Sequence, residues 1–242
     1  MSRKYHYPIR VLLIVSSILL ITSCANIDTQ AVFEAISGST VLDEATVAAG
    51  LREALEVGTD RTVAGTSTVD GFLGNALIRI ALPEEFDEMA SLLRGIGFDD
   101  EVDDMEIAMN RAAERASGEA RDVFWDSIRS MSIADAFGIL RGPDDAATNY
   151  FRQHTESELR ARFSPIVQNK MTEVGLYRIY EELSGYYERL PFVEKPAIDL
   201  EQYITDSALE GLFTVLAQEE ASIRKDPLAR STDLLRRVFS SL

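Results

Sequence analysis

The chain has 242 residues, of which 46% are hydrophobic and 26% charged, a length and composition that suit a single domain with a sizeable core. Its formal net charge of −16 repels phosphate backbones, so nucleic-acid binding by the whole domain is disfavoured. The single cysteine, Cys24, excludes an intramolecular disulfide and a cysteine cluster that could hold zinc or iron and sulfur.

The first predicted element is a secretory leader. Residues 1–10, MSRKYHYPIR, carry three basic residues and no acidic one, and an apolar run follows over residues 11–23. This run has 13 residues, fewer than the ~20 that an apolar helix needs to cross the hydrocarbon core of a bilayer. We therefore expect residues 1–23 to be a signal peptide and not a stable membrane span.

The leader ends in the sequence ITSC, which resembles a bacterial lipobox. In that resemblance a lipoprotein signal peptidase cuts before Cys24 after its thiol has received a diacylglyceryl group, and the new amine is usually acylated too. Several acyl chains hold a protein far more firmly than one, because each buried methylene contributes about 0.8 kcal/mol. The alternative, that Cys24 merely ends an ordinary signal peptide, is disfavoured by its position and context.

The lipobox also predicts a location and a domain plan. Ala25 follows Cys24 where an aspartate would favour retention, so we expect a lipid-anchored protein of the bacterial cell envelope, in the outer membrane and facing the periplasm. Residues 24–38 would form the lipidated tether and residues 39–242 a single α-helical domain. Without residues 1–23 the chain has 40 acidic and 21 basic residues, and this net charge of −19 favours solubility near a membrane.

A series of amphipathic helices is predicted next. Apolar residues recur every four positions within residues 42–58, with acidic residues at the start and Gly58 at the end. Residues 61–82 are rich in glycine and β-branched residues, which predicts an extended connection or a short β-hairpin. Pro83 opens another short helix, and residues 99–116 predict a core helix with an acidic outer face.

Further helices are expected to the end of the chain. Capping-box arrangements begin at Ser132 and Thr155, and Pro165 predicts a kink in the helix that follows the second of them. Ser231 is expected to cap the last helix. The sequence thus predicts a mainly α fold, a single compact domain of nine or ten helical segments without a convincing sheet.

Catalytic groups are scarce in the sequence. His154 is the one histidine outside the leader, too few for a ferritin-like di-iron site or a zinc protease. The acidic residues 99–104 lack the spaced oxygens and the central glycine of a calcium loop, and they suit a solvated helix start. We therefore expect no catalytic residue, no metal site and no cofactor. A carboxylate-based hydrolase is the least favoured function, because no spacing implies two carboxyls that face each other across a cleft.

Two polar residues on a predicted core helix suggest a binding site or a structural network. Asn110 and Arg111 interrupt a helix that otherwise looks buried, and they could reach the polar corner at residues 141–155. One interpretation is a structural network that pairs helix ends, since buried polar groups must be paired. The other is a cleft that binds a small molecule or lipid, with arginines that hold an anionic group. The candidate ligand-binding residues are Asn110, Arg111, Arg141, Asn149, Tyr150, Arg152 and Thr155.

Several of these segments resemble one bacterial lipoprotein family, that of domain of unknown function 4197 (DUF4197). The resemblance spans about residues 36–240 and includes MEIAMNRAAERA, SIADAFGILRGPDDAATNYFRQHT and LEGLFTVLAQEEASIRKDP. The blocks MNRAAE and AATNYF are its more specific parts. Pro143 stands where other members often carry glycine. The resemblance implies a helical envelope domain and brings neither an activity nor catalytic residues.

The favoured function is therefore that of a non-enzymatic binding or structural module, anchored through Cys24. Its expected partners are the lipid bilayer, through the acyl chains, and either another envelope protein or a second copy of the chain. The alternative is a small-molecule or lipid-binding protein that uses the polar cleft. A large exposed apolar patch would favour a protein partner, whereas an enclosed apolar cavity with a few polar groups would favour a ligand.

Overall fold

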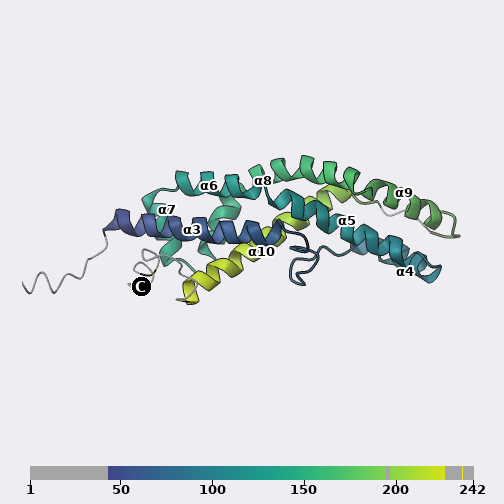
Figure 1. Ribbon diagram of the computed structural model, residues 1–242, viewed down its shortest axis with the longest axis horizontal. Coiled ribbons are helices and arrows are strands. Elements are labelled where there is room, and N and C mark those ends of the chain that lie inside the picture. Colours follow the sequence, from purple (N-terminus) through teal and green to yellow (C-terminus); the bar gives the residue numbers. More distant parts are fainter. Residues whose placement is uncertain (1–42, 194–196, 227–235, 237–242) are drawn as a thin grey trace, which may run out of the picture. The chain divides into compact units, whose positions relative to one another are not determined.

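A computed structural model describes residues 43–193, 197–226 and 236, all within one compact unit, Asp43–Leu242 (Figure 1). The described part contains no strand and consists of α-helices and one short 3-10 helix, so the predicted mainly α fold is confirmed. The helices are α3 (Glu44–Thr66), η1 (Glu84–Phe86), α4 (Asp87–Gly95), α5 (Asp99–Ser117), α6 (Ala120–Ser130), α7 (Ile133–Arg141), α8 (Ala146–Glu173), α9 (Leu176–Tyr187) and α10 (Leu200–Lys225).

Some of the predictions fall outside the described residues. These are the signal peptide at residues 1–23, the lipidated Cys24, the tether at residues 24–38 and the start of the last helix at Ser231. Within the described residues the helices are eight α-helices and η1, close to the nine or ten predicted.

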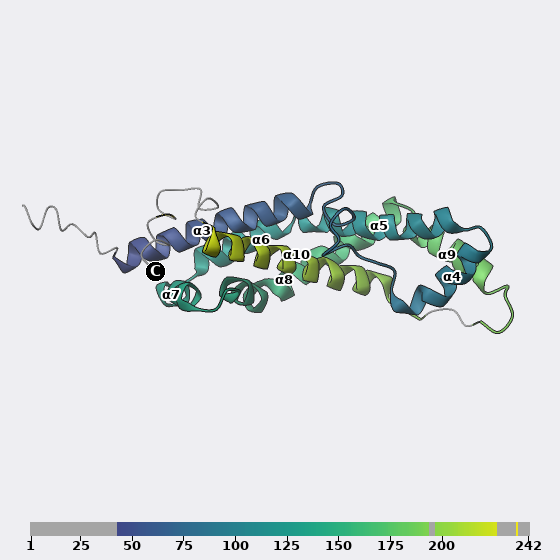
Figure 2. The same ribbon diagram turned by 90° about the horizontal axis from the view of Figure 1, so that it is seen from below.

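The long helices pack along one another. Helix α10 contacts α3, α5 and α8, and α5 also contacts α8 (Figures 1 and 2). Between them lie three buried aromatic rings, with Phe124 5.2 Å from Phe151 and 6.1 Å from Phe213 between ring centroids. These rings come from α6, α8 and α10, so one aromatic cluster joins three helices and contributes much of the apolar burial that drives folding.

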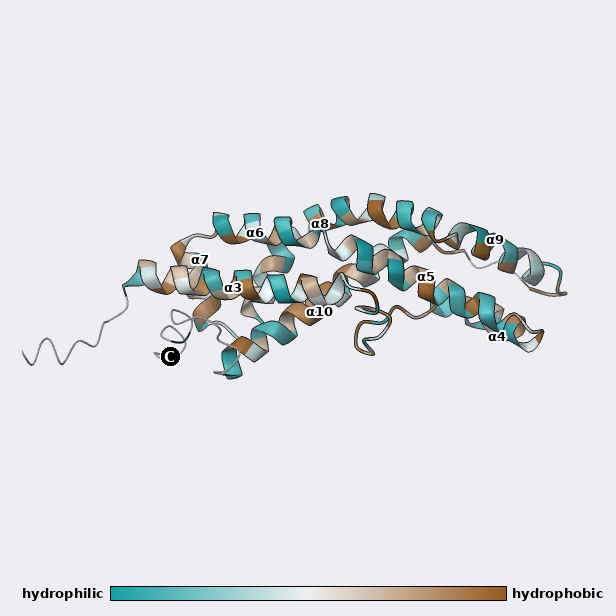
Figure 3. Ribbon diagram, viewed as in Figure 1, coloured by the Kyte–Doolittle hydropathy of each residue, from teal (hydrophilic) through white to brown (hydrophobic). Residues whose placement is uncertain are grey.

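Helix α5 is the core helix that the sequence predicts. Its inner face carries buried methionines and alanines, and its first turn is acidic. Ala112, Ala113 and Ala116 are fully buried, and their short side chains let α8 and α10 approach closely. Hydrophobic and hydrophilic residues alternate along the helices in Figure 3, as expected where a helix buries one face.

Of the two capping boxes that the sequence predicts, the structure contains one. The capping box at Ser132 is confirmed, because its hydroxyl accepts from the Asp135 N–H and the Asp135 carboxylate accepts from the Ser132 N–H. The one at Thr155 is wrong. Thr155 lies inside α8 and its buried hydroxyl donates to the Phe151 carbonyl, one turn back. Helix α8 continues through Pro165, so the proline removes a hydrogen bond without ending the helix.

Of the two alternatives for residues 61–82, the β-hairpin is not formed. Residues 61–66 are the C-terminal end of α3, and residues 67–83, here called the α3–α4 loop, form a connection of turns and irregular backbone without a strand. The alternating Ile78 and Ile80 are buried, as in a strand, but against helices. The side chain of Asn110 supplies the hydrogen bonds that a neighbouring strand would give to the backbone of Ile80.

Gly211 on α10 lets this loop lie directly on the helix. A Cβ atom at Gly211 would stand 2.5 Å from Cε1 of Phe72 and 3.2 Å from Cβ of Ile78, both buried loop residues. The absence of a side chain there allows the loop to approach, at the cost in helix propensity that glycine carries.

We predict that Gly211→Ala destabilises the protein by about 1–3 kcal/mol, because the methyl group overpacks the contact with Phe72. Gly138→Ala is the matched control. It places the same methyl group in the middle of α7, where no atom lies within 4 Å, and should stabilise the protein by about 0.5–1 kcal/mol. Urea unfolding measures both, and a stabilising Gly211→Ala would contradict the close approach.

Candidate functional site

Asn110 is fully buried on α5 and holds the α3–α4 loop. Its Nδ2 donates to the carbonyl oxygens of Ile80 and Glu106, each at 2.8 Å, and its Oδ1 accepts from the Ile80 N–H at 2.9 Å. The amide group is thus used by backbone groups of the protein itself. A buried side-chain amide without hydrogen-bond partners would reduce the stability of the fold. Asn110 therefore has a structural role.

Arg111 follows Asn110 in the sequence and also helps to hold the α3–α4 loop. Its guanidinium donates to Glu114 and to Asp70, each at 2.7 Å, and hydrogen bonding to these two carboxylates raises its pKa. Glu114 is buried and accepts from the N–H groups of Phe72 and Leu73 at 3.2 and 3.4 Å. Arg111 therefore neutralises a buried carboxylate that binds the loop backbone.

A second polar centre lies where α7 ends and α8 begins. The carboxylate of Glu220, from α10, accepts from the N–H groups of Ala147 and Thr148 and from the Thr148 hydroxyl, each at 2.9 Å. Asp145, at the N-cap position of α8, makes no capping bond with its side chain. Glu220 thus supplies the cap from another helix, and its negative charge faces the positive end of the α8 dipole.

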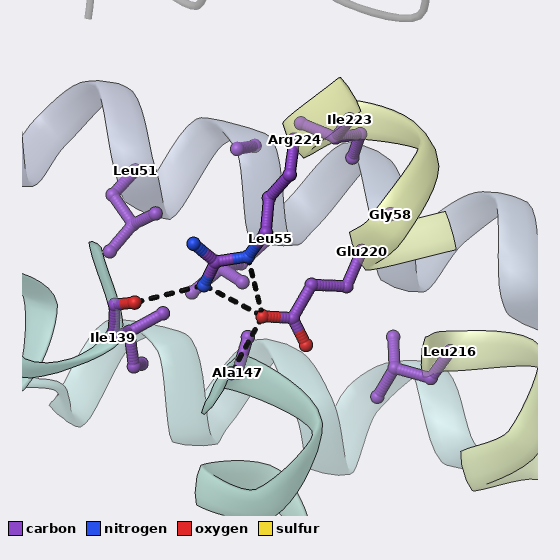
Figure 4. Close-up of a pocket in the computed structure, with 10 residues that line it drawn as sticks. Leu51, Leu55, Gly58, Ile139, Ala147, Leu216, Glu220, Ile223 and Arg224 are labelled. Atoms are coloured by element: carbon purple, nitrogen blue, oxygen red, sulfur yellow. Dashed lines mark hydrogen bonds and ion pairs between the residues drawn. The ribbon is translucent and has the colours of Figure 1, made fainter. Parts of the chain in front are cut away.

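Arg224 completes this centre one turn further along α10. Its guanidinium donates to Glu220 through Nε at 3.0 Å and through a terminal nitrogen at 2.8 Å. The same terminal nitrogen donates to the carbonyl of Ile139, in the last turn of α7, at 2.9 Å. Figure 4 shows Arg224 between this carbonyl and the Glu220 carboxylate. The pair therefore joins the end of α7, the start of α8 and the end of α10.

A small apolar cavity adjoins the pair. Its volume is about 30 Å³, roughly the share of one water molecule in the liquid. Leu51 and Leu55 of α3 and Leu216 and Ile223 of α10 lie around the two charged residues (Figure 4). A space of this size does not admit a lipid or a metabolite, so the Glu220–Arg224 centre is a structural element of the corner.

An open groove along α8 and α10 holds two of the candidate ligand-binding residues. Asn149 and Arg152 line it on α8, and its volume is about 450 Å³. Arg152 donates to Glu210 of α10 at 2.8 Å and its guanidinium lies 4.5 Å above the centre of the Phe213 ring. Further along the groove, Arg160 pairs with Asp206. The arginines here connect α8 to α10 and are already paired with carboxylates.

The remaining candidates lie elsewhere. Arg141 is exposed at the end of α7, with its guanidinium 5.0 Å from the centre of the Phe137 ring. Tyr150 stacks on His154, with 4.0 Å between ring centroids, and burial raises the pKa of the Tyr150 hydroxyl. Thr155 is buried in α8.

The seven candidate ligand-binding residues therefore lie in several places and do not line one common cleft. Asn110 and Arg111 bind the α3–α4 loop, Asn149 and Arg152 share the groove, and the corner is held by residues that sequence reasoning missed, Glu220 and Arg224. The spacing of four residues between Glu220 and Arg224 was a usable signal for an ion pair. It gave no indication that the pair is buried or that it caps another helix.

Metal ions and membrane spans receive no support from the described residues. Within the ranges described, no three His, Cys, Asp or Glu side chains gather closely enough to hold a metal ion. None of the helices that the structure describes is both long and apolar enough to cross a bilayer.

We predict that Glu220→Ala destabilises the protein by about 3–5 kcal/mol, because it removes the carboxylate that Arg224 binds and leaves the first N–H groups of α8 without their acceptor. Glu210→Ala, on the same helix, is the control. It removes an exposed ion pair with Arg152 and should cost at most about 1 kcal/mol. Urea unfolding of both variants measures the difference, and equal losses would show that the Glu220 centre is not structural.

Comparison with known proteins identifies the family. The model of the family described as Protein of unknown function (DUF4197) matches residues 41–240, and the chain therefore belongs to this family. This confirms the resemblance carried by the blocks MNRAAE and AATNYF. No curated protein and no solved structure matches the chain significantly.

Proposed function

We propose that this member of the DUF4197 family is a lipid-anchored binding domain of the bacterial cell envelope, which faces the periplasm and acts without catalysis. The observation that carries the proposal is the N-terminal sequence. A basic segment, an apolar run of 13 residues and the motif ITSC occur in the order required for a lipoprotein leader that ends before Cys24. Ala25 supports transfer to the outer membrane.

The folded unit lies close to this anchor in the sequence. The described residues begin at Asp43, 19 residues after Cys24, and the intervening chain can span at most about 65 Å when fully extended. A domain on such a tether stays near the membrane surface. Without residues 1–23 the net charge is −19, which favours solubility there.

The use of the buried polar groups favours binding over catalysis. Asn110, Glu114 and Glu220 are the buried polar side chains with the most hydrogen bonds in the two centres, and all of those bonds go to this chain's own backbone and side chains. A catalytic group needs access to a substrate, whereas these groups fix a loop and a helix end. The surface of the domain is then the part available for interaction.

We predict that Cys24→Ser abolishes incorporation of a fatty-acid label and leaves the protein unprocessed or released from the membrane, because the thiol is the attachment point. Metabolic labelling with an alkyne fatty acid, followed by membrane fractionation, measures both. The control, Ala25→Asp, keeps the cysteine and should remain labelled while it shifts to the inner membrane. Label on the Cys24→Ser protein would overturn the proposal.

The groove along α8 and α10 supports a second candidate function, the binding of a small anionic molecule. Its volume of about 450 Å³ lies within the range of ligand sites, and Asn149 and Arg152 offer donors to a bound group. In this function the ligand would take the place of Glu210 on Arg152.

The second candidate predicts that native mass spectrometry, on protein extracted from its own envelope in mild detergent, shows a retained small mass. Arg152→Gln should lose most of that mass, whereas Arg178→Gln, which changes an exposed arginine on α9, should keep it. No added mass on the wild-type protein, or equal masses on both variants, would exclude the groove as its site.

A further inference from the structure

We propose that the surface formed by α4, the start of α5 and α9 docks a cationic, amphipathic segment of another protein. The proposal deepens the proposed function by naming a surface and a class of partner, and it rests on that function only for the location in the envelope. The α4–α9 surface is defined by four apolar residues, Leu92, Ile96, Phe98 and Tyr186, and by the acidic residues around them.

The apolar part of this surface is unusually exposed. Leu92 is 39% exposed, Ile96 55% and Tyr186 39%. These three are among the eight large hydrophobic side chains that are exposed within the described residues. Large apolar side chains are normally buried, and a group of exposed ones marks an interaction site more often than chance exposure.

The exposed residues belong to one place in the fold. Leu92 lies in the second half of α4, and Ile96 directly follows the end of this helix. Helix α4 contacts α9, and the two lie side by side in both views of the ribbon (Figures 1 and 2). The Phe98 and Tyr186 rings, with 4.3 Å between centroids, connect the two helices directly.

Acidic residues surround this apolar group. Residues 84–104 contain nine acidic residues and one basic residue, and residues 176–193 contain three acidic and two basic residues. These two segments thus carry a charge of −9 out of the −16 of the whole chain. The one arginine of the first segment, Arg94, is bonded to Asp103 at 2.6 Å and lies 3.8 Å from Asp99.

The negative charge of these two segments indicates which class of partner can bind here. An anionic lipid surface would be repelled, and in a pair of copies joined through this surface the two acidic rims would face each other. A protein segment with lysines or arginines beside a row of apolar residues complements both features. Its apolar side chains would cover Leu92 and Ile96, and its basic side chains would meet carboxylates such as Asp100.

The test uses the full chain, reconstituted in nanodiscs of neutral phosphatidylcholine, and a fluorescent helical peptide of about 18 leucine and lysine residues with all leucines on one face. Peptide anisotropy measures the affinity. We expect the double variant Leu92→Ser/Ile96→Ser to bind at least tenfold more weakly. The matched control, Val69→Ser/Leu77→Ser, removes two equally apolar side chains that are 71% and 68% exposed in the α3–α4 loop, and should bind within about twofold of wild type. Added salt should also weaken binding.

Several results would overturn the proposal. One is an equal affinity for a peptide in which glutamate replaces every lysine; another is an equal loss in the two double variants. Binding to anionic vesicles, or dimerisation in sedimentation velocity, that is lost only in Leu92→Ser/Ile96→Ser would assign the surface to a membrane or to a second copy. Both variants change exposed positions, and circular dichroism checks that they are folded. Failure here leaves the lipidation of Cys24 untouched, so the two proposals are tested separately.

Discussion

The arrangement of the helices around the corner depends on one buried carboxylate. Glu220 lies away from water, where a single charge would be very unfavourable, and it is compensated by the first N–H groups of α8 and by Arg224. Since Arg224 also binds the last turn of α7, moving any of these three helices would leave a charge or a backbone group unpaired. The leucines of α3 then cover the pair on its apolar side. Such a centre specifies the geometry more than it adds stability.

In two places of the molecule, a polar side chain on one helix pairs with backbone groups of another segment. At the corner a side chain of α10 completes a helix end, and on α5 Asn110 and Glu114 complete the backbone of a loop. In both places a long, well-packed helix carries the polar group, and the backbone that it pairs belongs to the start of another helix or to a loop. The blocks MNRAAE and AATNYF contain these groups, namely Asn110 and Glu114 in the first block and the N–H groups of Ala147 and Thr148 in the second.

Local features were predictable and distant pairings were not. The apolar period of α5 and the capping box at Ser132 depend on neighbouring residues, and the sequence revealed both. Ile78 and Ile80 alternate as in a strand, but the backbone of Ile80 pairs with the side chain of Asn110, 30 residues away, which no local pattern indicates. Asn110 and Arg111 stand out in the sequence as polar residues on a helix that otherwise looks buried. The groups that they bind became visible only when the loop was placed against α5.

The position of α10 in the chain has a consequence for the order in which the protein folds. Its contacts with α3, α5 and α8, and the bond between Glu220 and Thr148 across 72 residues, join the last long helix that the structure describes to the earlier ones. During synthesis from the N-terminus, α3, α5 and α8 lack the helix that packs against all three of them until α10 has been made. The native core therefore forms only late in synthesis.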